Sequence, residues 1–170
     1  MRLVILSMLA SLFLVIFQTS IAPFFQIGII RADGFCALVT WLAVEAPFIP
    51  SSLLAVLIAG ASASMASVAA WYSYPAAFFL AYLIVSYNRI GIMDFTYLHR
   101  ILLTCLAAFI IELFLFMSGG NLEGFWPWGL MQSLFNMLLA PLFFTIFHSV
   151  SSMFQKIGNL RRTENDQETI

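Results

Sequence analysis

Four polar side chains interrupt stretches of sequence that are otherwise almost wholly apolar. Gln18, Glu112, Gln132 and Asn136 are the residues whose chemistry needs an explanation. An unpaired amide or carboxyl group is costly in hydrocarbon, so such groups usually face other protein groups or a water-filled cavity. Amides donate and accept hydrogen bonds, and a carboxyl group can accept them or hold a proton. This pattern predicts recognition through buried polar contacts.

The stretches around these residues define the class of protein. The chain has 170 residues, of which 62% are hydrophobic and 9% are charged. Soluble domains carry about 25% charged residues, and apolar runs of about 20 residues indicate membrane spans. We therefore predict an all-α membrane protein with a six-transmembrane-helix bundle. The expected spans cover residues 3–22, 35–48, 52–70, 75–87, 101–117 and 125–150, the second and fourth being short.

The cationic residues predict the orientation of these spans. An even number of spans with both termini in the cytoplasm leaves Arg31 as the one cation outside. The six cations then inside are Arg2, Arg89, Arg100, Lys156, Arg161 and Arg162. That distribution satisfies the positive-inside rule. We expect residues 1–154 to form one integral membrane domain and residues 155–170 to form a disordered, solvated cytoplasmic tail.

Counting along the predicted spans places three of the polar groups at a similar depth. At about 1.5 Å per residue, Glu112 lies about 9 Å and Gln132 about 8 Å from the outer ends of their spans. Gln18 also lies near the outer end of its span, and Asn136 follows Gln132 one helical turn deeper. The group could fix helix packing, contact a partner's transmembrane segment, or bind a polar substrate.

Small residues and one proline mark further candidate helix contacts. In the third span Gly60 and Ser64 are four residues apart, as are Ala63 and Ser67. This spacing lets helix backbones approach closely, either inside the bundle or in a groove for a partner's helix. Pro141 removes a backbone donor from the last span and predicts a kink.

Signatures of catalysis and of nucleic-acid binding are weak. Residues 60–63, Gly-Ala-Ser-Ala, loosely resemble the rhomboid protease motif, but Ser62 is predicted near the middle of the bilayer and His148 near its cytoplasmic face. A serine–histidine dyad needs hydrogen-bond contact, so this reading fails. Cys36 and Cys105 lie in apolar runs and are expected to be core thiols. We predict no enzyme activity, no cofactor, no metal site and no nucleic-acid partner.

The layout of the chain resembles MreD, the family of rod-shape-determining membrane proteins of bacteria. The resemblance depends on Gln18 before Pro23, on Asp33 at the start of the second span, and on Asn136 five residues before Pro141, with Lys156 following. The pattern departs from the family at Ala32, where a proline is usual. It also departs at Ser64, where the third span usually carries an acid.

This resemblance implies a non-catalytic scaffold in the bacterial cytoplasmic (inner) membrane. Its implied partners are an MreC-type protein with one span and a periplasmic domain, the actin-like MreB, and the RodA glycosyltransferase with its transpeptidase. The complex builds peptidoglycan and maintains cell shape. The family's fold is similar to that of the substrate-binding subunits of energy-coupling-factor vitamin transporters. A subunit of such a transporter is therefore the alternative, with Gln18, Glu112 and Gln132 lining a pocket.

Overall fold

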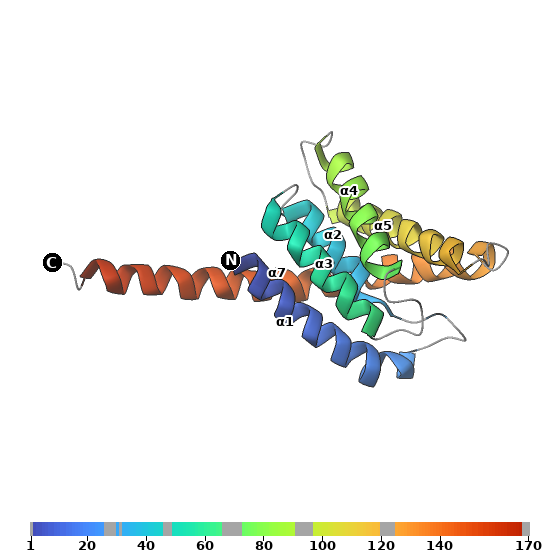
Figure 1. The fold of residues 1–170 in the computed structure, drawn as a ribbon. Helices are drawn as coiled ribbons and strands as arrows, with labels where there is room; N and C mark the ends of the chain where they lie inside the picture. The colour runs from blue at the N-terminus through green and yellow to red at the C-terminus, as the bar shows by residue number, and fades with distance from the viewer. Residues whose placement is uncertain are drawn as a thin grey trace.

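The computed structural model of this chain is almost entirely helical (Figure 1). It describes residues 2–25, 30, 32–45, 49–65, 73–90, 97–119 and 125–167. The first half contains α1 (Arg2–Ile16), the π-helix η1 (Phe17–Ile21), the 3-10 helix η2 (Ala22–Phe25), α2 (Gly34–Glu45) and α3 (Pro50–Met65). The second half contains α4 (Ser73–Ile90), α5 (Tyr97–Ser118), the π-helix η3 (Phe125–Gly129) and α7 (Leu130–Gln167).

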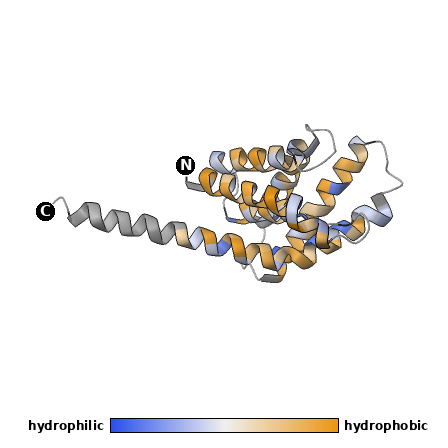
Figure 2. Ribbon diagram, turned by 90° about the horizontal axis from the view of Figure 1, so that it is seen from below, coloured by the Kyte–Doolittle hydropathy of each residue, from blue (hydrophilic) through white to orange (hydrophobic). Residues whose placement is uncertain are grey.

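Within this described part of the chain, three helical segments are long and apolar enough to cross a membrane. They are Val4–Phe24, Leu98–Ser118 and Trp126–Met153. Hydrophobic residues predominate along the helices (Figure 2), and large apolar side chains are found both in the core and exposed at the surface. The protein is therefore compatible with membrane insertion, as the composition indicates. The count of six spans stays a prediction, because α2 and the apolar helix Pro50–Ser64 are shorter than a full span.

The bundle is built around α2. This helix contacts α1, α3, α4, α5 and α7, and every residue from Gly34 to Val44 is buried. A helix that is apolar on all sides is covered either by other helices or by lipid, and here other helices surround it. Its 12 residues extend only about 18 Å. The helix at the predicted second span is thus the central helix of the bundle.

The small residues of α3 face other helices of the same chain. Ala59, Gly60 and Ala63 are buried, and α3 packs against both α1 and α4. A Cβ atom on Gly60 would lie 2.7 Å from the Pro75 Cα of α4, so the two backbones meet there. At Gly60 the small-residue spacing therefore serves internal packing. Ser64 is half-buried and donates to the carbonyl of Ala61 in its own helix, while Ser67 lies outside the described residues.

A buried hydroxyl pair links α3 to α4. The Ser52 and Tyr82 oxygens are 2.6 Å apart, and the Ser52 hydroxyl also lies 2.7 Å from the carbonyl oxygen of Ile49. Since a serine hydroxyl has one proton, which the Ile49 carbonyl accepts, the Tyr82 hydroxyl is the donor to Ser52.

Replacing Tyr82 by Phe removes this donor and keeps the ring. We expect a loss of about 1 kcal/mol in the free energy of unfolding, the usual net value of one hydrogen bond. Equilibrium unfolding in mixed detergent micelles measures it. Tyr87→Phe is the matched control, because the Tyr87 side chain is exposed. Equal stability of the two variants would contradict the assignment.

The last helix is longer than the span expected from the sequence. α7 continues from Leu130 to Gln167, with Pro141 inside it. The helix therefore continues through residue 155, the predicted start of the polar tail. The separate, disordered tail and the kink at Pro141 stay predictions.

An ion pair joins the end of α2 to the start of α5. The Arg100 Nη2 atom lies 3.5 Å from Glu45 Oε1, and both side chains are partly exposed. The end of α2 and the start of α5 therefore lie side by side at one end of the bundle. The pair lies at the opposite end of α2 from Asp33, so the two ends of this core helix carry different polar contacts.

Candidate functional site: a polar cluster at the start of α2

Asp33 caps the N-terminus of the core helix. Its Oδ1 atom accepts a hydrogen bond of 2.9 Å from the backbone N–H of Phe35. The first N–H groups of a helix have no partner within it, and an aspartate before the first helical residue satisfies one of them. The positive end of the helix dipole also stabilises the negative charge of the carboxylate. The Asp33 side chain therefore provides a polar contact at the start of α2, whose other faces are enclosed by neighbouring helices.

Gln18 reaches Asp33 from the end of the first span. The Gln18 Nε2 atom donates to Asp33 Oδ1 over 2.6 Å, and the glutamine side chain is buried. Gln18 belongs to the π-helix η1, whose wider turn follows α1 directly. Such single π turns are frequent at functional sites. The hydrogen bond between Gln18 and Asp33 links the end of the first span to the start of α2.

Asn136 and Gln132 reach the same point from α7. The Asn136 Oδ1 atom accepts a 3.0 Å hydrogen bond from the backbone N–H of Asp33. It also accepts a longer one, 3.3 Å, from Gln132 Nε2 one turn earlier. Both side chains are buried. Asp33, Gln18, Asn136 and Gln132, which we call the Asp33 cluster, thus link three separate parts of the chain.

Cys36 and Glu112 border the Asp33 cluster. The Cys36 thiol donates weakly to Asp33 Oδ2 over 3.5 Å, and Asn136 Nδ2 lies 3.9 Å from the same sulfur. Glu112 is half-buried on α5 and lies within electrostatic range of Cys36. Asp33, just before α2, and Glu112, on α5, therefore lie near one buried thiol.

Most of this cluster, but not its centre, could be identified from the sequence. The structure brings Gln18, Gln132 and Asn136 together, with Glu112 nearby. Asp33 was noted only for its place in the family pattern, because it lies in a predicted loop where counting depth along spans gives no position. The Asp-Gly pair immediately before an apolar run is the signal that could have found it, since aspartate is a favoured N-cap. Gly60, Ala63 and Ser64 belong to α3 contacts instead.

The chemistry of the Asp33 cluster is that of a hydrogen-bonded joint. Its contacts are carboxylate and amide groups bonded to one another and to backbone N–H groups. Among the residues that the structure describes, no group of three or more His, Cys, Asp or Glu side chains could hold a metal ion. The geometry favours positioning of helices, which is the first of the roles that the sequence left open.

The cluster predicts that Gln18 and Asn136 act together through Asp33. Gln18→Leu and Asn136→Leu should each lower the free energy of unfolding by about 1 kcal/mol, within the range measured for interhelical hydrogen bonds. Their effects should not add, because each removes a group that holds the same aspartate, and a coupling of about 0.5 kcal/mol or more is expected. A double-mutant cycle by unfolding in detergent measures the coupling. Strict additivity would show that the two contacts are independent.

Comparison with protein-family models, with curated proteins and with solved structures gives no match for this chain.

Proposed function

We propose that this chain is a divergent MreD-type scaffold of the machinery that elongates the bacterial cell wall. In this proposal it is a six-span protein of the cytoplasmic membrane, with both termini inside and with no catalytic role. Its companions are an MreC-type single-span protein, MreB, and RodA with its transpeptidase.

One observation carries most weight in support. Gln18, Asp33 and Asn136 carry the resemblance, and Asp33 hydrogen-bonds both to Gln18 and to Asn136. Removing any one of these side chains leaves its partner with an unmade hydrogen bond in an apolar environment, which is costly. A joint of this kind suits a scaffold, which must present fixed helix surfaces to its partners.

The exposed face of α1 also supports a scaffold role. Because lipid tails are as apolar as leucine, packing and a few polar contacts must carry the specificity of helix contacts. α1 exposes a row of large apolar side chains, including Met8, Leu12 and Ile16, on the face away from the core. Such a face is suited to lipid or to the span of a partner protein.

Depletion of the protein in its host tests the proposal. Rod-shaped cells should become round as the protein is lost, because cell-wall synthesis would no longer be confined to elongation. Wild-type protein expressed from a second copy should restore the rods. Cells that keep their shape but acquire a vitamin requirement would contradict the scaffold and support the transporter subunit.

A further inference from the structure

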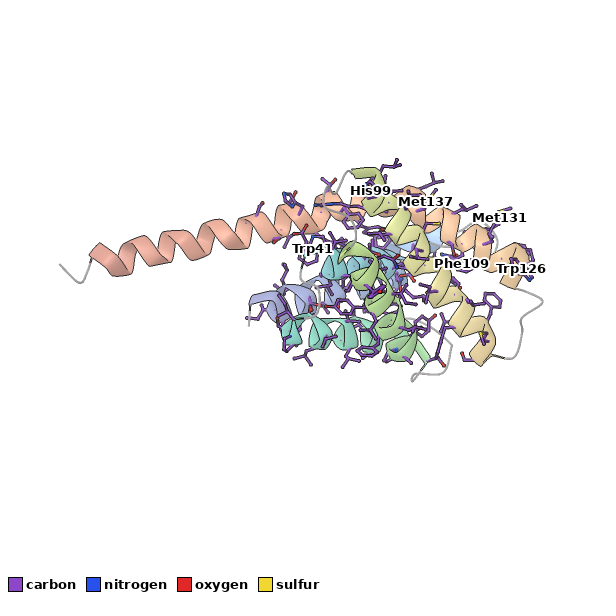
Figure 3. The ribbon with its side chains drawn as sticks, turned by 90° about the horizontal axis from the view of Figure 1, so that it is seen from above. Trp41, His99, Phe109, Trp126, Met131 and Met137 are labelled. Atoms are coloured by element: carbon purple, nitrogen blue, oxygen red, sulfur yellow. The ribbon has the colours of Figure 1, made fainter. Side chains whose placement is uncertain are left out.

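A second polar site lies at the other end of the bundle from the Asp33 cluster. It is a pocket of about 210 Å³ between α5 and α7, lined by Arg100, Phe144, Thr145, His148 and Ser149. Figure 3 shows His99, the neighbour of Arg100, and Trp126 towards opposite ends of the paired helices α5 and α7. We call this cavity the Arg100 pocket.

The Arg100 pocket lies near the ends of two candidate membrane spans. Arg100 is two residues inside the start of the candidate span Leu98–Ser118, and His148 is five residues before the end of Trp126–Met153. At about 1.5 Å per residue, both lie within about 8 Å of the ends of these spans. If these segments cross a membrane, the pocket lies where hydrocarbon gives way to phosphate groups.

The groups in the Arg100 pocket suit an anion. A guanidinium has five N–H donors in a planar fork that matches phosphate oxygens. The contact with Glu45 is 3.5 Å, longer than the roughly 2.9 Å of a strong charge-assisted bond, and leaves other donors of Arg100 available. The side chains of His148 and Ser149 are exposed and can add donors. Arg100 also lies in the first turn of α5, where the helix dipole favours negative charge.

Two other polar groups limit what the pocket can do. Thr145 donates its hydroxyl proton to the carbonyl of Pro141 over 2.8 Å, so it shapes the wall and supplies no donor. Glu45 is an anion beside Arg100 and would repel a second one. An anionic ligand must therefore compete with Glu45 for the guanidinium. Removing the charge of Glu45 should then strengthen anion binding, and removing that of Arg100 should weaken it.

We propose that the Arg100 pocket binds the phosphate group of an anionic membrane lipid. Basic pockets between spanning helices on the cytoplasmic side are known to receive such headgroups. In this site Arg100 contacts two phosphate oxygens, and His148 and Ser149 contact the remaining ones. Free inorganic phosphate presents the same oxygens, so the test must separate these two sources.

Native mass spectrometry of the full-length protein, released from detergent micelles containing phosphatidylglycerol, tests this proposal. Arg100→Gln should weaken retention of the lipid about tenfold. Glu45→Gln breaks the same ion pair but removes the competing anion, so it should keep or increase lipid retention. Arg89→Gln, which removes a cation from the last turn of α4, is the control for net charge and should bind as the wild type does.

A second series distinguishes the sources and guards against misfolding. Inorganic phosphate at millimolar concentration should leave the lipid bound if the site takes headgroups, and should displace it if the free anion is the ligand. If Arg100→Gln does not fold, His148→Gln at its exposed position should weaken lipid retention about threefold. Equal weakening by Arg100→Gln and Glu45→Gln would overturn the proposal and leave only a structural ion pair. Unchanged retention in Arg100→Gln and His148→Gln would overturn it as well.

Discussion

Replacing Asp33 by Ala should destabilise the protein more than any other single change in the Asp33 cluster. The substitution removes the acceptor for the Phe35 N–H and for the Gln18 amide, so one helix cap and one contact between spans are lost. A lost cap costs about 1 kcal/mol and a lost interhelical hydrogen bond a further amount near 1 kcal/mol. We expect the free energy of unfolding to fall by about 2 kcal/mol, measured by unfolding in mixed micelles.

Asp33→Asn is the matched variant for this experiment. Asparagine keeps one side-chain oxygen in the same place and is itself a favoured N-cap, so it should retain most of the stability. The comparison separates hydrogen bonding from charge. Alanine and asparagine variants of equal stability would contradict the role assigned to the Asp33 oxygen.

Gly60→Ala should separate α3 from α4. The added methyl would lie 2.7 Å from Pro75 Cα and 3.1 Å from Pro75 N, both of which are backbone atoms that cannot rotate away. Alanine gains up to about 1 kcal/mol over glycine from helix propensity. Overpacking typically costs about 1 to 3 kcal/mol, so the clash outweighs this gain. We expect a net loss of about 1 to 2 kcal/mol and a lower temperature of thermal unfolding in detergent.

Gly119→Ala provides the control for the same chemical change. A Cβ at Gly119 would lie 3.4 Å from the Leu115 carbonyl oxygen and 3.8 Å from that of Phe116, at the exposed end of α5. Its thermal unfolding temperature should stay close to that of the wild type. A Gly60→Ala variant as stable as Gly119→Ala would show that α3 and α4 can separate there without loss.

The helical, apolar class could be predicted from the sequence because composition and run length report it directly. The role of α2 could not. Residues 34–45 read equally well as a short span and as an enclosed helix, since both are apolar on every side. Only the contacts made by α1, α3, α4, α5 and α7 decide between them. Similarly, the spacing of Gly60 predicted close packing but could not identify Pro75 as the partner.

The Asp33 cluster was predictable where it follows helical geometry. Gln132 and Asn136 are four residues apart, so their contact follows from one helical turn, and the depth of Gln18 placed it at the same level. Asp33 could not be placed by such counting because its position depends on where the loop before α2 returns. The ion pair of Glu45 with Arg100 was missed for a related reason. Glu45 and Arg100 lie on different helices, so no spacing along the sequence brings them together.

The two ends of α2 now have separate proposed roles. At its start, Asp33 joins the first span and α7 through buried hydrogen bonds. At its end, Glu45 contacts Arg100 beside the pocket between α5 and α7. A core helix fixed in this way at its start can hold the surrounding helices in register, which the proposed scaffold requires.

The most direct test of the scaffold is capture of the tagged, full-length protein from gently solubilised membranes of its host. Mass spectrometry then identifies the proteins that accompany it. We predict recovery of an MreC-type single-span protein together with RodA, from the wild type and from Asp33→Asn, and reduced recovery from Asp33→Ala at equal membrane levels. A folded wild-type protein that brings down none of the cell-wall elongation machinery, or that brings down a transporter's ATP-hydrolysing subunits instead, would contradict the account.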